Sequence, residues 1–226
     1  MREHERLSKG ILTACCIAAL LLLVAPVGAQ DEHQGHGEMH GEMHGEMEGE
    51  AQGEPEMTPE QVAMMAAWQK AMTPGEAHAK LAAMAGDYDL VMTSWMDPSA
   101  PPMVSNGTAH REMTMGGRVM VEEVAGTAMG QSFTGRSTTG YDNVSGEYWS
   151  TWNDDMSTGL IVSYGKWDEA VGGLVWHTEH NDPMTGGKKQ ARMVSKFNDD
   201  GSELFTWYDK VEGGEVKTME IVYTKR

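Results

Sequence analysis

The sequence predicts a mainly β fold, an antiparallel up-and-down β-barrel of about ten strands preceded by two short α-helices. Two observations predict it. Helix-capping patterns stand at "TPEQ", residues 58–61, and at "TPGE", residues 73–76. After Gly86 the pattern changes to short alternating segments separated by turn motifs such as "DNVSG" and "EGGE". A sandwich of two sheets is the alternative architecture for such a pattern.

The first 29 residues are typical of a secretory signal peptide. A positively charged start precedes the apolar run "ILTACCIAALLLLVAPV" and the small-residue cleavage motif "VGA". We therefore expect an exported protein, periplasmic or extracellular, whose mature chain begins at Gln30 and is not stably inserted in a membrane. An uncleaved anchor and lipidation at "LTAC" are the alternatives; Pro26 disfavours the first, and the very short apolar run before Cys15 disfavours the second.

Cysteine usage and charge exclude several classes of function. Both cysteines, Cys15 and Cys16, lie inside the predicted signal peptide, so the mature chain has no disulfide, thiolate nucleophile or zinc–thiolate site. The chain has a formal net charge of −17, and residues 31–57 hold nine acidic residues and no Lys or Arg. An acidic surface repels phosphate backbones, so nucleic acid is not an expected partner.

Residues 30–57 form a low-complexity acidic tail, which we expect to be disordered. It contains "HGEMHGEMHGEM", in which each His precedes a Met by three residues and the next His by four. Imidazole nitrogen and thioether sulfur suit Cu(I) and Ag(I), and these spacings place the side chains on one stripe of a helix. The alternative is a solvated spacer without a ligand. The candidate copper or silver ligands are His36, Met39, His40, Met43, His44 and Met47.

Residues 58–226 hold the predicted folded domain, which begins with the two helices. In "TPEQ" the threonine caps the first helix, the proline suits its first turn and the glutamine completes a capping box. Met64, Trp68 and Met72 are four residues apart, which predicts one apolar face. The second helix begins at "TPGE" and ends at Gly86, a natural C-terminal stop.

The remaining chain divides into strands joined by short turns. Short connections make neighbouring strands pair antiparallel, and about ten such strands favour a sheet that closes on itself. The expected strands are 88–96, 104–115, 118–128, 131–141, 147–153, 160–168, 174–181, 188–197, 203–211 and 215–224.

Alternation along the strands predicts which side chains share a face. Tyr148, Ser150 and Trp152 lie on one face of their strand, which we expect to be the interior, and Trp149 lies on the other. Aromatic residues occur on both faces of several strands, and most of them are expected to be ordinary core. The residues expected to contact a ligand in the lumen are Tyr148, Trp152, Trp176, His180 and Tyr208.

Several long motifs resemble a known family. The chain from about Thr73 to the C-terminus resembles the bacterial family called domain of unknown function 1579, which implies no established activity. The motifs that carry the resemblance are "TPGEAHAKLAAMAGDYDL", "WMDPSAPPMVSNGTAHREMTMGGR", "MGQSFTGRSTTGYDN", "YWSTWNDDMSTG" and "HNDPMTGGKK".

A wider resemblance is to calycins, the lipocalin and fatty-acid-binding barrels. It rests on the short helix, the Gly-x-aromatic pair Gly86 and Tyr88, and the strands that follow. Lipocalins usually have Trp where this chain has Tyr88. Calycins often end with a basic residue near that aromatic, for which Lys225 and Arg226 are the candidates. The resemblance implies a lumen that holds a small apolar molecule.

We therefore expect a non-catalytic binder of a small apolar molecule, with soft-metal binding by the tail as the alternative function. An enzyme is the less favoured class, because the chain has no nucleophile elbow, phosphate loop, zinc-protease helix or dinucleotide fingerprint. The motifs "DDMSTG" and "DPMTGG" resemble each other. Turn chemistry explains both motifs, and the alternative is a pair of loops at one barrel mouth.

Overall fold

The computed structural model describes residues 57–96 and 100–226. The predicted signal peptide (1–29) and the predicted tail (30–57), apart from Met57, lie outside the described residues. The helices are α1, Pro59–Met72, and α2, Glu76–Ala83. The strands are β1, Gly86–Ser94; β2, Met103–Thr114; β3, Val119–Ala128; β4, Gln131–Asp142; β5, Glu147–Asp154; β6, Ile161–Asp168; β7, Gly173–Asn181; β8, Lys188–Phe197; β9, Glu203–Val211; and β10, Gly214–Lys225.

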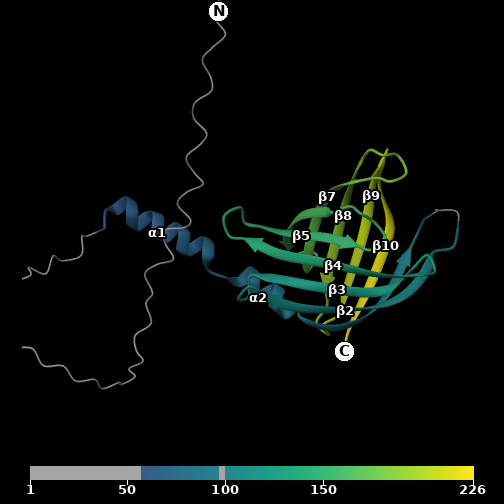
Figure 1. Ribbon diagram of the computed structural model, residues 1–226, viewed down its shortest axis with the longest axis horizontal. Coiled ribbons are helices and arrows are strands. Elements are labelled where there is room, and N and C mark those ends of the chain that lie inside the picture. Colours follow the sequence, from purple (N-terminus) through teal and green to yellow (C-terminus); the bar gives the residue numbers. More distant parts are fainter. Residues whose placement is uncertain (1–56, 97–99) are drawn as a thin grey trace, which may run out of the picture. The chain divides into compact units, whose positions relative to one another are not determined.

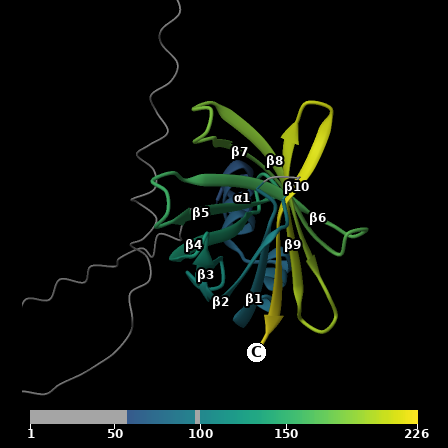
Figure 2. The same cartoon turned by 90° about the vertical axis from the view of Figure 1, so that its right-hand side faces the viewer.

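The ten strands form one closed antiparallel barrel in which each strand pairs with its neighbours in the sequence (Figures 1 and 2). The barrel closes where β1 pairs with β10, with Tyr88 opposite Lys225 and Leu90 opposite Tyr223. This confirms the predicted up-and-down barrel and excludes the sandwich. Because every connection is a hairpin, successive turns alternate between the two ends of the barrel. We call the end that holds α2 the α2 end, and the other the distal end.

The turn between β3 and β4 shows how local sequence sets the strand register. Met129 and Gly130 both have positive φ, 52° and 77°. A two-residue hairpin of this kind needs positive φ at both central positions, which glycine adopts without a steric penalty. Ala128 is therefore paired with Gln131, and the register continues unbroken to Val119 opposite Gly140.

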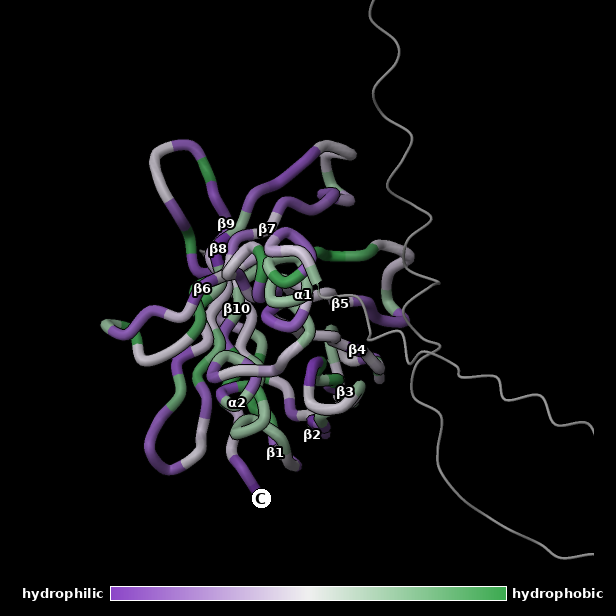
Figure 3. Tube along the Cα trace, turned by 90° about the vertical axis from the view of Figure 1, so that its left-hand side faces the viewer, coloured by the Kyte–Doolittle hydropathy of each residue, from purple (hydrophilic) through white to green (hydrophobic). Residues whose placement is uncertain are grey.

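Alternating burial identifies the interior face of each strand. On β1, Tyr88, Leu90 and Met92 are buried, whereas Asp89 and Val91 between them are exposed. Hydrophilic and hydrophobic stretches correspondingly alternate along the strands in Figure 3. The buried side chains form two clusters, one centred on Leu81, Tyr148 and Trp176 and the other on β1, β2 and β10. The interior is therefore a packed core over much of its length.

The helix α1 begins with the predicted capping box. The Gln61 backbone N–H donates to Thr58 Oγ1, and the Thr58 backbone N–H donates to the Gln61 side chain. The apolar stripe predicted for this helix is not covered, because no residue of α1 is buried and Trp68 is 53% exposed. No helix in the described part of the chain is long and apolar enough to cross a membrane.

Two turns of the barrel hold the C-terminal end of α1. Asn143 Nδ2 donates to the carbonyl oxygens of Lys70 (3.0 Å) and Thr73 (2.8 Å), and Arg118 donates to the Met72 carbonyl (2.7 Å). These bonds satisfy carbonyl groups that have no partner within the helix. Both helices lie toward the viewer in Figure 3.

Candidate functional site

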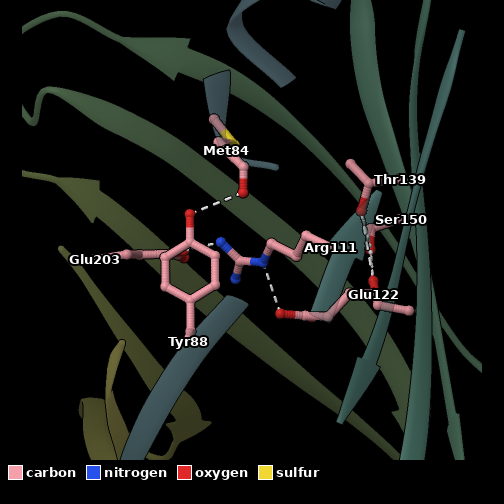
Figure 4. Close-up of polar contacts among 8 residues, drawn as sticks. Met84, Tyr88, Arg111, Glu122, Thr139, Ser150 and Glu203 are labelled. Atoms are coloured by element: carbon pink, nitrogen blue, oxygen red, sulfur yellow. Dashed lines mark hydrogen bonds and ion pairs between the residues drawn. The ribbon is translucent and has the colours of Figure 1, made fainter. Parts of the chain in front are cut away.

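The α2 end of the interior is filled by apolar side chains. Leu81 and Met84 are 0% and 7% exposed and pack in one cluster with Met120, Leu174 and Trp176 of the strands. The Tyr88 hydroxyl donates to the Met84 carbonyl at 2.8 Å (Figure 4). Packing together with this bond closes the barrel at the α2 end.

A buried ionic cluster crosses the interior beside α2. Arg111 on β2 donates through Nε to Glu122 Oε1 (2.7 Å) and through Nη1 to Glu203 Oε2 (2.6 Å) (Figure 4). All three residues are at most 8% exposed. The guanidinium also lies against the rings of Tyr88 (4.9 Å) and Tyr223 (4.4 Å). We call these five residues the Arg111 cluster.

The two glutamates keep Arg111 charged despite its burial. Burial alone would lower the pKa of Arg111, but the carboxylates of Glu203 and Glu122 raise it well above its ordinary value. Burial raises the pKa of Tyr223 well above its ordinary value, so its hydroxyl stays protonated. Lys225, the basic residue expected near Tyr88, lies 5.9 Å from the centre of that ring. The Arg111 cluster is thus a closed set of partners with a structural role.

Above this region, a row of small side chains runs across five neighbouring strands. Thr139, Ser150, Ser163, Thr178 and Ala191 are consecutive cross-strand partners on β4 to β8, and all face the interior. We call them the small-residue row. Four of the five are between 4% and 7% exposed, and Ser150 is partly exposed. The row occupies less of the interior than longer side chains would.

Three of the four hydroxyls of this row, those of Thr139, Ser150 and Thr178, make local hydrogen bonds. Thr139 Oγ1 donates to Ser150 Oγ at 3.1 Å, and Thr178 Oγ1 donates to the Val162 carbonyl at 2.8 Å. Ser137 Oγ lies 3.3 Å from Ser150 Oγ. With these bonds made, the row contributes mainly methyl and methylene groups to the barrel interior.

Bulky residues flank the row on both sides. Toward the α2 end, the next row contains Tyr148, Trp176 and Trp207, and Tyr148 meets Trp176 edge-on at 6.3 Å. Gly165 separates them, and a Cβ there would lie 2.7 Å from the Trp176 ring, so glycine makes room for the indole. Toward the distal end, Trp152 takes the position beside Ser137. The small-residue row therefore lies between an aromatic row on its α2 side and Trp152 on its distal side.

Four of the five predicted ligand contacts share this interior. Tyr148 and Trp176 are 3% and 6% exposed, and Trp152 and His180 are partly buried on the same face. Tyr208 lies on the outer face, where the Arg192 guanidinium covers its ring at 4.4 Å. The alternation of β9 instead places Trp207 inside, opposite Met193. Tyr208 is therefore not brought together with the other four.

The sequence analysis did not identify a polar group at the distal end of β7, β8 and β9. Asp209 accepts hydrogen bonds from Trp207 Nε1 and from Lys189 Nζ, both at 2.7 Å. Trp207 belongs to the row on the α2 side of the small-residue row, and its indole meets the His180 ring edge-on at 5.5 Å. His180 and Lys189 are cross-strand partners, so the four side chains adjoin one another. We call them the distal cluster.

The two similar turn motifs also lie at the distal end. "DDMSTG" joins β5 to β6 and "DPMTGG" joins β7 to β8, and both connections fall at the end opposite α2. In each turn an aspartate side chain caps the loop: Asp154 accepts from the Met156 N–H, and Asp182 accepts from the Met184 N–H, both at 3.0 Å. The similarity is explained by this capping chemistry, and the two loops do share one end.

Two grooves lie outside the small-residue row. One of about 440 Å³ lies beside α2 and is lined in part by Lys80, Lys166 and Trp167. Another of about 620 Å³ is lined by β1 to β5 and includes His110 and Arg136. In the first groove, carboxylates lie 3.5 Å from Lys80 and 3.4 Å from Lys166. A ligand that formed an ion pair with these exposed lysines would gain little affinity, because such pairs contribute little in water. We therefore favour the interior over this groove.

The described residues contain no group of three or more His, Cys, Asp or Glu side chains that could hold a metal ion. The six predicted ligands, His36 to Met47, lie outside the described part of the chain. The copper and silver hypothesis therefore rests on the sequence spacing alone.

Comparison with protein families assigns the chain. The profile of the family described as "Protein of unknown function (DUF1579)" matches residues 73–225, and the chain belongs to this family. The match covers the whole barrel and α2, and it confirms the resemblance seen in the sequence motifs. A search of curated proteins found no match.

Proposed function

We propose that this member of the DUF1579 family binds a small, largely apolar molecule inside its barrel, without catalysis. The observation that carries the proposal is the small-residue row between the aromatic row of Tyr148 and Trp176 and the indole of Trp152. Ligand sites are typically lined by apolar and aromatic side chains with a few placed polar groups. The interior wall from Trp176 through the row to Trp152 and His180 has this composition.

The closed α2 end supports one direction of access. Leu81, Met84 and the Arg111 cluster fill that end, and the Arg111 cluster is held by short ion pairs. A ligand would therefore reach the small-residue row from the distal end, past His180.

The test fills the row with a larger side chain. N-phenyl-1-naphthylamine, a neutral apolar dye, should bind the wild-type protein with a rise in fluorescence. Ala191→Leu adds three carbons in the middle of the proposed site, and these carbons occupy space that the dye would need. Dye binding should therefore weaken roughly tenfold or more.

Two further variants control for a general loss of stability. Ala125→Leu makes the same change on the exposed outer face of β3 and should leave dye binding unchanged. Ala191→Gly removes a methyl group at the site and should keep binding intact. If the dye does not bind, or if the two leucine variants behave alike, the interior is not the ligand site.

A second candidate function is soft-metal binding by the tail, favoured by the three His-x-x-Met repeats. The two functions do not conflict, because they use different parts of the chain. We propose that both operate outside the cytoplasm, since the first 29 residues have the pattern of an export signal.

A further inference from the structure

His180 has a buried polar atom without a partner. Its Nδ1 is fully shielded from solvent and makes no hydrogen bond within the described residues. His180 stands on the interior face of β7, two positions beyond Thr178 of the small-residue row, and its ring contacts Trp207. Buried polar atoms in proteins are nearly always hydrogen-bonded, and the described side chains supply no partner to this one. Because Nδ1 has no accessible surface in this structure, a ligand atom reaches it only when the His180 ring or a neighbouring side chain turns.

The charged groups around His180 are already paired. Lys189 and Asp209 form an ion pair at 2.7 Å, and Asp209 also accepts from Trp207 Nε1. Asp182, just beyond β7, accepts from the Met184 N–H (3.0 Å) and from Thr185 Oγ1 (2.9 Å). A charged ligand group placed here would have to break one of these pairs or stay unpaired in a partly buried setting, and both are unfavourable.

We propose that the ligand is an uncharged molecule with an apolar body and one hydroxyl or carbonyl group, and that this group hydrogen-bonds to His180 in the distal cluster. The inference rests on the proposed function and specifies the class of ligand. Neutral imidazole has one donor and one acceptor nitrogen, so it suits either head group. The apolar body then lies along the small-residue row, beside Trp152 and Trp176.

The other buried atom without a partner does not offer the same site. Trp167 Nε1 also lacks a hydrogen bond within the described residues, but it belongs to the α2 end. There the Trp167 ring is stacked on Phe197 at 5.8 Å and covered by Lys80 at 4.4 Å. Of these two atoms, only His180 Nδ1 lies next to the small-residue row.

The experiment compares three head groups on one chain. The full-length protein is loaded with N-phenyl-1-naphthylamine, and 1-decanol, decanoate and decylamine are added as competitors. We expect decanol to displace the dye at the lowest concentration. His180→Phe keeps a flat ring against Trp207 but removes the hydrogen bond, and should weaken decanol about threefold to tenfold. Displacement by decanoate and decylamine should change little in this variant.

Matched variants separate the hydrogen bond from packing. His177→Phe, on the outer face of the same strand, should change none of the three competitors. His180→Gln retains a donor and an acceptor and should keep most of the preference for decanol. The inference is overturned if the acid or the amine is the best competitor, or if His180→Phe leaves decanol unchanged. In either case, the proposed function stands if the dye binds and Ala191→Leu weakens its binding. If the dye does not bind, both proposals fail.

Discussion

Arg111 joins strands that are far apart in the sequence, and its removal tests the interior most directly. Arg111→Met keeps the length of the side chain but leaves Glu122 and Glu203 buried without a counter-charge. Breaking one partner of a buried ion pair costs about 3–5 kcal/mol. We expect the free energy of unfolding, measured by urea titration at pH 7, to fall by about that amount.

A triple variant controls for packing in this experiment. Arg111→Met combined with Glu122→Gln and Glu203→Gln removes all three charges and should recover much of the loss. In the single variant, burial raises the pKa of the unpaired carboxyls, so their protonated forms favour folding. Its stability should therefore rise as pH falls, the sign expected for acids whose folded pKa exceeds the unfolded value. A loss below about 1 kcal/mol would show that the cluster is solvated.

His110 offers a test of electrostatics on the outer face. Its Nδ1 lies 2.7 Å from Asp87 Oδ1, and this hydrogen bond raises the pKa of His110. The stabilisation is complete below the unfolded pKa of about 6.5 and is lost as pH rises through the raised folded value. An NMR titration of the His110 ring should give a lower pKa in Asp87→Asn than in the wild type. Asp89→Asn, two positions further along β1, should leave that pKa unchanged.

The candidate site was only partly predictable from single residues. Alternation placed Tyr148 with Trp152 and Trp176 with His180, and all four face the interior. On β9 both faces carry aromatic side chains, Phe205 and Trp207 on one and Tyr208 on the other, so composition could not separate them. The cross-strand pairing of Met193 with Trp207 decides the face, and pairing depends on tertiary structure. The lack of a hydrogen-bond partner for His180 Nδ1 among the described residues likewise depends on how the side chains pack.

Among the elements, α1 and α2 differ sharply in their contribution to the stability of the fold. Leu81 of α2 is 0% exposed and lies in the core, whereas Val62 of α1 is 53% exposed. Leu81→Ala should lower the free energy of unfolding by about 2–5 kcal/mol, because it leaves a cavity among residues that cannot fully collapse. Val62→Ala should change it by less than about 0.5 kcal/mol. Equal losses in a thermal or urea titration would mean that α1 is also part of the packed core.

The strands were the most predictable elements, because two local signals agree. Every observed strand overlaps its predicted range, since turn residues bound each segment and side chains alternate within it. Part of the Arg111 cluster could also be predicted from the sequence. Arg111 and Glu122 lie at equal distances from the "MGGR" turn and are direct partners across the hairpin. Glu203, from the distant β9, enters the cluster only when the barrel closes.

The buried strand faces could not be assigned as reliably as the strand ranges. Trp149 faces outward yet is partly buried, because its ring lies over Gly140, where a Cβ would come within 2.4 Å of it. Glycine on the neighbouring strand thus gives an outer tryptophan a partly covered position. The apolar stripe of α1 gives the opposite case, a core-like pattern that the barrel leaves exposed.

For the whole molecule, the two proposed functions separate along the chain. A protein that begins at Met57 retains every described element of the barrel. It should bind N-phenyl-1-naphthylamine as tightly as the chain that begins at Gln30. Loss of dye binding on this truncation, measured by the same fluorescence titration, would mean that residues 30–56 contribute to the ligand site.

Metal binding should show the reverse dependence on the tail. The chain that begins at Gln30 is titrated with Cu(I) against a competing chelator and should bind one to about three ions, because two to four soft ligands normally hold one ion. The chain that begins at Met57 should bind none at these affinities. Binding should weaken as pH falls through about 6.5, since imidazole must be neutral to coordinate, while the thioethers keep some Cu(I) affinity in acid. Replacing Met39, Met43 and Met47 by Leu should weaken Cu(I) binding and leave Zn(II) binding nearly unchanged, because Zn(II) has little preference for thioether sulfur. Equal responses of the two metals would indicate a plain histidine cluster. Dissociation constants above about 10 μM, a binding free energy smaller than roughly 7 kcal/mol, would mean that the repeat is only a solvated spacer.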